Sequence, residues 1–212
     1  MLWRVPGGII RDASTLALFV TWGVCPLPTS QPISAVAFQA VGDSLTSWEG
    51  LEFSGQPRID VSWTETARGD GTIFMGGWAR GGAESGDILA NMPDIVPGAL
   101  VVLAGTNDIN HGVAQSVTIT NIAAIAAQAN GLVVISAVPP LNLHPDEASK
   151  LNDALSLLAE DNSWTFVDPW VSFRDAGGMW VGGASPDGVH PDRATADRAG
   201  HVIHNVVLYS RR

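Results

Sequence analysis

Cysteine and charged residues are scarce in this sequence of 212 residues. Cys25 is the single cysteine, so no disulfide can form within the chain and no cluster of thiolates can hold a metal ion. Charged side chains make up 15%, yet no run of about 18 or more apolar residues predicts a membrane-spanning helix. The hydrophobic fraction, 46%, is too high for a disordered protein. These features predict a globular chain with a sizeable core.

Basic residues are also few, and the chain is strongly acidic. Eleven lysines and arginines stand against 21 acidic residues, which gives a net charge of −10. Such a chain repels phosphate groups, so nucleic acid and anionic membrane surfaces are poor partner candidates. The length fits one domain, which we place at residues 36–212, behind an N-terminal extension of residues 1–35.

The N-terminal extension has two interpretations. The apolar run Leu16–Val24 follows a weakly basic start, and Ala35–Ala37 has the small-x-small form of a cleavage site, so the extension resembles a secretory signal or anchor. However, cleavage there would remove the start of the first predicted strand. The alternative is an arm that packs on the domain. The sequence slightly favours a secreted or cell-surface location over a cytoplasmic one.

Apolar runs alternate with helical patterns from residue 35 onward. The runs lack strict polar-apolar alternation, as is typical of strands covered on both faces. The predicted strands are Ala35–Val41, Thr72–Met75, Ala99–Leu103, Leu132–Ala137 and Trp164–Val167. The predicted helices are Ser85–Asn91, Ser116–Gln128, Pro145–Glu160 and Asp192–Leu208. This order predicts an α/β fold, a three-layer α/β/α sandwich with a mainly parallel five-stranded sheet.

Four polar motifs carry the candidate chemistry. Gly42–Leu45, the pair Gly81 and Gly82, and Gly105–Asp108 follow the first three predicted strands, and Asp187–Pro191 lies near the C-terminus. Because ligands bind at the carboxyl ends of parallel strands, we expect the first three motifs to meet on one rim. A serine nucleophile needs a base, a carboxylate that orients the base, and donors for the oxyanion. The four motifs contain a candidate for each role.

In this order the motifs resemble the sequence blocks of the SGNH hydrolases, the GDSL-type esterases and lipases, over about residues 36–205. The resemblance implies a flavodoxin-like fold with Ser44 as the nucleophile and Asp187 and His190 as the other members of a catalytic triad. It also implies hydrolysis of esters through an acyl-serine intermediate. The spacing of three residues between Asp187 and His190 agrees, because one short loop can present both side chains.

The resemblance further implies an oxyanion hole. Its donors would be the backbone N–H groups of Ser44 and Gly82 and the side chain of Asn107, with Gly81 as a one-residue alternative to Gly82. Glycine suits this position because the backbone must approach the substrate closely. Members of the family need no cofactor, and we expect neither a cofactor nor a metal here.

Tryptophan is abundant, with eight in the chain, and suggests a substrate class. Trp48 and Trp180 lie on segments that lead to the predicted rim, where an aromatic face can stack on a sugar or line an acyl pocket. The alternative is that both rings only pack the loops around Ser44 and His190.

The sequence therefore predicts a serine esterase for short-acyl carboxylic esters, with a small-molecule or carbohydrate ester as its substrate. An acyltransferase of the same fold and a non-catalytic binding module are the alternatives. The natural substrate, the oligomeric state and the fate of residues 1–35 stay open.

Overall fold

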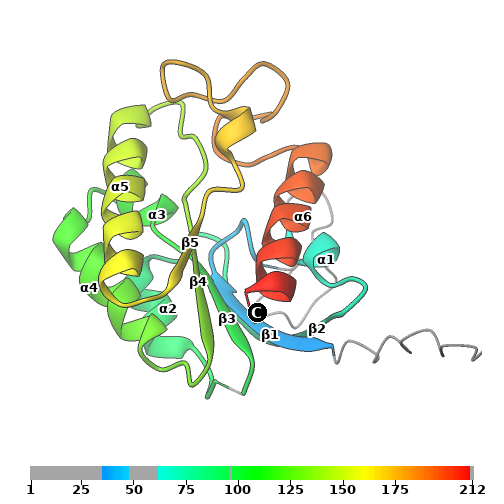
Figure 1. Ribbon diagram of the computed structural model, residues 1–212. Coiled ribbons are helices and arrows are strands. Elements are labelled where there is room, and N and C mark those ends of the chain that lie inside the picture. The colour runs from blue at the N-terminus through cyan, green and yellow to red at the C-terminus, as the bar shows by residue number, and fades with distance from the viewer. Residues whose placement is uncertain (1–34, 48–61, 96, 211–212) are drawn as a thin grey trace, which may run out of the picture. The chain divides into compact units, whose positions relative to one another are not determined.

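Five parallel strands form the central sheet, in the order β2-β1-β3-β4-β5. The structure, a computed structural model, describes residues 35–47, 62–95 and 97–210 (Figure 1). The strands are β1 (Val36–Gly42), β2 (Thr72–Ala79), β3 (Ala99–Leu103), β4 (Leu132–Ser136) and β5 (Thr165–Val167). The five-stranded parallel sheet predicted from the sequence is therefore confirmed.

Strand β2 continues four residues beyond its predicted end at Met75. Gly76 and Gly77 both lie inside the strand, where the register of β1 against β2 shifts. A Cβ on Gly77 would lie 1.9 Å from the backbone oxygen of Ala40. The glycine pair thus forms an irregularity that lets two strands approach closely, rather than a strand end.

Six α-helices and one short 3₁₀ helix accompany the sheet in the described residues. They are α1 (Thr64–Ala67), α2 (Ser85–Asn91), α3 (Thr106–His111), α4 (Gln115–Ala126), α5 (Pro145–Asp161), η1 (Val171–Phe173) and α6 (Arg193–Tyr209). The four helices predicted from the sequence are present, each within two residues of its predicted bounds. Helices α1 and α3 and the 3₁₀ helix were not predicted, because each is too short to show a hydrophobic period.

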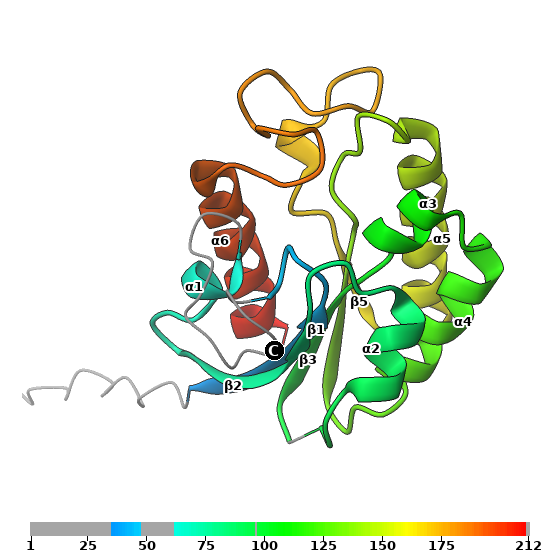
Figure 2. The same cartoon turned by 180° about the vertical axis from the view of Figure 1, so that it is seen from behind.

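The helices cover both faces of the sheet, so the predicted three layers are confirmed. Helices α1 and α6 lie on one face, and α2, α4 and α5 lie on the other (Figures 1 and 2). Successive residues of β3 point to opposite sides: Val101 and Leu103 pack in the first layer, and Leu100 and Val102 in the second. All five residues of β3 are buried, which explains why polar residues do not alternate along it.

Helix α6 is anchored at the end that matters for the site. Its N-cap residue, Asp192, accepts a hydrogen bond of 2.8 Å from the backbone N–H of Thr195. Its inner face then buries Ala199, Ile203 and Val207 against the sheet. Because Asp192 follows His190 by two residues, this cap fixes where the preceding loop ends.

The predicted N-terminal extension lies outside the described residues, apart from Ala35, so its two interpretations stay predictions. Among the helices that the structure describes, none is long and apolar enough to cross a membrane.

Candidate active site

The candidate nucleophile, Ser44, lies in a tight turn directly after β1. The backbone N–H groups of Thr46 and Ser47 both donate to the backbone oxygen of Asp43, over 3.1 and 2.8 Å. The side chain of Asp43 accepts a further bond, of 3.0 Å, from the N–H of Leu45. These bonds hold the turn in one conformation and leave Ser44 half-buried at the carboxyl edge of the sheet.

Ser44, His190 and Asp187 form a continuous chain of contacts. Ser44 Oγ lies 2.9 Å from His190 Nε2, although the two residues are 146 positions apart. His190 Nδ1 lies 2.7 Å from Asp187 Oδ2. The three residues expected to form a triad therefore meet, and their geometry allows the imidazole to take a proton from the serine hydroxyl.

Asp187 is held in its ionised form by its own loop. Its Oδ1 accepts hydrogen bonds from the backbone N–H groups of Val189 and His190, over 2.9 and 2.8 Å. Partial burial acts to raise the pKa of Asp187, but these bonds and the one from the His190 ring outweigh it and lower the pKa to about 2. The carboxylate is thus negatively charged wherever an esterase is assayed.

The expected oxyanion donors lie on two segments beside the serine. Asn107 sits in the first turn of α3 and donates one N–H to the backbone oxygen of Ala83, over 3.0 Å. Its amide has a second N–H for a ligand. Gly81 and Gly82 are exposed, and Gly82 has a φ of 79°, which glycine adopts without strain. A Cβ on Gly81 would lie 3.9 Å from Ser44 Cβ, so this loop passes beside the nucleophile. The choice of Gly82 as the backbone donor stays a prediction.

A buried carboxylate fastens the glycine loop to the helix that carries Asn107. Asp108, 1% exposed, accepts hydrogen bonds from the backbone N–H of Ser85, over 2.8 Å, and from the Ser85 hydroxyl. It also accepts one from the Thr118 hydroxyl on α4, over 3.0 Å. Since Ser85 begins α2, Asp108 joins three helix segments around the candidate oxyanion hole.

Asp43 is a second buried carboxyl group in the same region. Burial raises its pKa to about 6, and the nearby charge of Asp108 adds to this. The Leu45 N–H, His190 and the Thr106 hydroxyl act in the opposite direction. The sequence gives no sign of this, because Asp43 looks like an ordinary turn residue there.

Trp180, one of the two expected substrate contacts, is buried in this structure. Its side chain is 6% exposed and packs edge-on against Trp170, with ring centroids 6.0 Å apart and planes at 79°. This packing favours the alternative in which Trp180 only holds the loops together, and its role as a substrate contact stays a prediction. The sequence places Trp180 on the right segment, but it does not reveal which way the side chain points. Trp48 lies outside the described residues, and its expected role stays a prediction.

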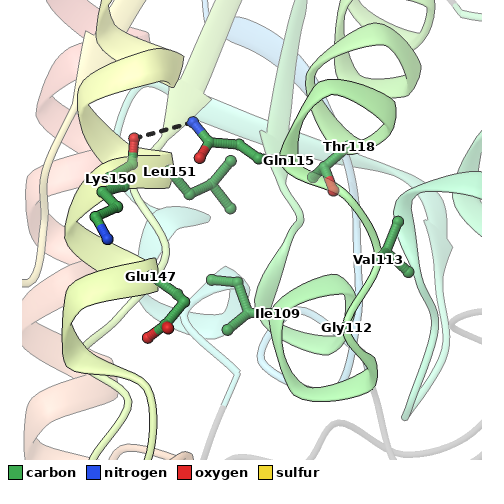
Figure 3. Close-up of a pocket in the computed structure, with 8 residues that line it drawn as sticks. All are labelled: Ile109, Gly112, Val113, Gln115, Thr118, Glu147, Lys150 and Leu151. Carbon is green, nitrogen blue, oxygen red and sulfur yellow. Dashed lines mark hydrogen bonds between the residues drawn. The ribbon is translucent and has the colours of Figure 1, made fainter.

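A cavity of about 170 Å³ lies between α3, α4 and α5, away from the triad (Figure 3). Its lining includes the apolar side chains of Ile109, Val113 and Leu151, and Glu147 and Lys150 lie on the α5 side of it. None of the expected site residues lines it. Within the part of the chain that the structure describes, no group of three or more His, Cys, Asp or Glu side chains is placed to hold a metal ion.

Comparison with known proteins gives one family. A sequence model of the GDSL-like lipase/acylhydrolase family matches residues 40–198, a stretch that includes every expected triad and oxyanion residue. No curated protein matches the sequence.

Solved structures share the fold at low sequence identity. A GDSL-like lipase from Bacteroides thetaiotaomicron is 21% identical, with a TM-score of 0.64 over 81% of this chain and 87% of that one. An aryl esterase from M. smegmatis is 17% identical, with a TM-score of 0.58 over 82% and 98%. A catalytic mutant of an acetylxylan esterase from Geobacillus stearothermophilus is 13% identical, with a TM-score of 0.62 over 84% and 96%.

Asp43→Asn should change how stability depends on pH. The carboxyl group ionises near pH 3.8 in the unfolded chain and near 6 in the folded one, so between these values only the unfolded state releases its proton. Stability therefore falls as pH rises through this window, by about 3 kcal/mol at most. Asn cannot ionise, so urea unfolding at pH 4 and pH 7.5 should show the variant gaining on the wild type at pH 7.5. A difference between the two proteins that is the same at both pH values would contradict the raised pKa.

Proposed function

We propose, since the chain belongs to the GDSL-like lipase/acylhydrolase family, that it is a serine esterase acting on short-acyl carboxylic esters. The observation that carries the proposal is the contact chain from Ser44 Oγ through His190 to Asp187, over 2.9 and 2.7 Å. Family membership supports acyl hydrolysis as the class of reaction. The contacts among Ser44, His190 and Asp187 support Ser44 Oγ as the atom to which the acyl group is transferred.

Acylation begins with a proton transfer from Ser44 to His190. His190 Nε2 takes the hydroxyl proton of Ser44 while Oγ attacks the ester carbonyl carbon. Asp187 accepts the hydrogen bond from Nδ1–H, which keeps Nε2 free of a proton and stabilises the imidazolium that forms. Because Asp187 is ionised well below neutral pH, it serves this role across the whole working range.

The oxyanion and the leaving group complete the cycle. The carbonyl oxygen becomes negative and accepts hydrogen bonds from the N–H groups of Ser44 and Gly82 and from the second N–H of Asn107. His190 then gives its proton to the departing alcohol, which leaves an acyl group on Ser44. A water molecule loses a proton to His190, attacks the acyl carbon and releases the carboxylic acid, which restores the serine hydroxyl.

A short acyl group suits the surroundings of the triad. Asp187 and both glycines of the oxyanion loop are exposed, and the cavity in Figure 3 is lined by none of the triad residues. A long acyl chain needs an extended apolar channel, and the exposed residues described beside the triad do not form the wall of one. An acetylated carbohydrate is the candidate natural substrate, since the acetylxylan esterase of G. stearothermophilus shares this fold.

Ser44→Ala should lower the turnover of p-nitrophenyl acetate by at least about a thousand-fold, because the acyl group then has no oxygen to which it can bind. Ser149→Ala, an exposed serine on α5, is the matched control and should keep wild-type activity. Hydrolysis by the wild type that survives in Ser44→Ala would contradict the nucleophile. No hydrolysis by the wild type would favour the binding module, and ester formation with an added alcohol would favour the acyltransferase.

Asp187→Asn should lower kcat by about 10²–10⁴-fold, because an amide in this place favours the wrong imidazole tautomer. Asp175→Asn provides the control, since Asp175 also accepts two backbone N–H bonds in a loop but contacts no histidine among the described residues. Steady-state kinetics at pH 8 measure both. A loss of less than about five-fold at Asp187 would show that another acceptor orients the ring.

Acyl length should set the rate, with acetyl and propionyl esters turned over faster than longer ones. A series of p-nitrophenyl esters from two to twelve carbons measures kcat/KM, and acetate release from acetylated xylan tests the carbohydrate. Preference for acyl chains of eight or more carbons would contradict the short-acyl proposal. If Trp48→Ala leaves acetate release from xylan unchanged, Trp48 does not stack on the sugar.

A further inference from the structure

Two buried polar side chains near the proposed nucleophile have no part in the ester hydrolysis proposed above. Asp43 is 0% exposed and Thr106 is 1% exposed. Within the described residues, neither Asp43 Oδ2 nor Thr106 Oγ1 has a hydrogen-bond partner of standard geometry. Polar atoms that are buried without partners destabilise a fold, and native proteins hold few of them. Two together, next to a catalytic serine, call for an explanation.

The two side chains follow the ends of neighbouring strands. Strand β1 pairs with β3 so that Gly42 lies opposite Leu103. Asp43 directly follows Gly42, and Thr106 begins the helix that follows β3. The Thr106 hydroxyl acts to lower the pKa of Asp43, so the two groups are close enough to interact although no bond of standard length and angle joins them. Their chemistry matches, because a carboxylate can only accept and a hydroxyl can donate.

Each of the two residues directly precedes a residue with a proposed role in the reaction. Asp43 precedes Ser44, and Thr106 precedes Asn107. Asp43 is fixed to the turn of the nucleophile through the bond from the Leu45 N–H to Oδ1, over 3.0 Å. A bond from the Thr106 hydroxyl to the other carboxylate oxygen would tie this turn to the start of α3.

We propose that Asp43 and Thr106 are a pair of positioning residues, in which the Thr106 hydroxyl donates to Asp43 Oδ2 and so sets the spacing between Ser44 Oγ and the Asn107 amide. The inference rests on the proposed esterase function, because that spacing matters only if an oxyanion forms. Hydrogen bonds of a catalytic site are often long in the free enzyme and tighten in the transition state. The pair therefore closes as the oxyanion draws Asn107 toward Ser44.

Two other charged groups face the Asp43 carboxyl group. His190, on the loop before α6, acts to lower its pKa, and Asp108, on α3, acts to raise it. A negative Asp43 favours the imidazolium form of His190 that arises during acylation and is the stronger acceptor for the Thr106 hydroxyl. Below about pH 6 the carboxyl group gains a proton and both effects weaken.

A purely structural role for Thr106 predicts a different kcat for the Thr106→Val variant. If the Thr106 hydroxyl is only a buried polar group without a partner, Thr106→Val removes the cost of burying it and hardly changes the shape of the side chain. Thermal stability then rises or stays level, and kcat is unchanged. The positioning pair instead requires kcat to fall without a loss of stability. The two roles therefore differ in the kcat that they predict for the same variant.

The experiment measures kcat, KM and thermal midpoint for Thr106→Val, Thr106→Ser and the control Thr72→Val on p-nitrophenyl acetate at pH 8. We expect Thr106→Val to lower kcat about ten-fold with KM within two-fold, less than the 10²–10³-fold typical when an oxyanion donor is deleted. Thr106→Ser keeps the hydroxyl and should recover kcat to within about three-fold. Thr72 is buried at the start of β2, the opposite end of the sheet, and donates to the backbone oxygen of Ala67 over 2.7 Å. Its replacement should lower the midpoint and leave kcat intact.

Asp43→Asn and the double variant Asp43→Asn/Thr106→Val complete the test. Because both changes break one contact, the double variant should have a kcat close to that of the worse single variant. Multiplied losses, a wild-type kcat in Thr106→Val, or a loss that Thr106→Ser does not recover would each overturn the pair. Should Thr106→Val fail to fold, Thr106→Ala takes its place: a kcat at least about five-fold lower at pH 8 that Thr106→Ser recovers supports the pair, and a smaller loss overturns it. Absence of Ser44-dependent turnover in the wild type would defeat the proposed function itself, whereas turnover that these variants leave unchanged defeats only the pair.

Discussion

Parallel pairing of β1 with both β2 and β3 is the constraint from which the site follows. In a parallel sheet the carboxyl ends of all strands lie at the same edge. The segments that follow three neighbouring strands therefore lie close together there. The serine turn, the glycine loop and the Asn107 helix are these three segments, with the serine in the middle because β1 lies between the other two strands. The loop with Asp187 and His190 does not follow one of these three strands. It precedes α6, and the capped start of that helix fixes where the loop ends.

Three aspartates of this edge show how environment decides what one side chain does. Asp187 is half exposed and accepts bonds from its own loop, so it stays ionised and orients a histidine. Asp108 is buried, but three donors satisfy it, and it serves as a structural joint between helices. Asp43 is as deeply buried with a single standard bond, and its pKa rises accordingly. Asp108 and Asp43 thus lie equally deep but differ in the number of donors that they accept from.

The sequence is informative wherever local chemistry and fold agree, and it fails where tertiary contacts decide. The five strands, four longer helices and three layers could all be predicted, because apolar runs and helical periods are local patterns. The contacts among Ser44, His190 and Asp187 match the arrangement that the family resemblance implies. By contrast, the predicted second strand stops at Met75, because the glycine pair that follows carries no apolar pattern, whereas β2 continues to Ala79. The burial of Trp180 and the reach of Asp108 to Ser85, 23 residues away, depend on side-chain directions that no local pattern contains.

The distance along the chain between Ser44 and His190 has a consequence for the newly synthesised protein. The serine is made early and its partner 146 residues later, so for most of synthesis the hydroxyl has no base beside it. An isolated serine hydroxyl is a weak nucleophile that does not attack esters at neutral pH. Under the proposed mechanism, Ser44 therefore becomes reactive only once His190 lies beside it, on the loop that ends at the capped start of α6. A chain in which Ser44 Oγ and His190 Nε2 have not yet met carries only an unactivated serine hydroxyl, so the proposed reactivity is tied to completion of the fold.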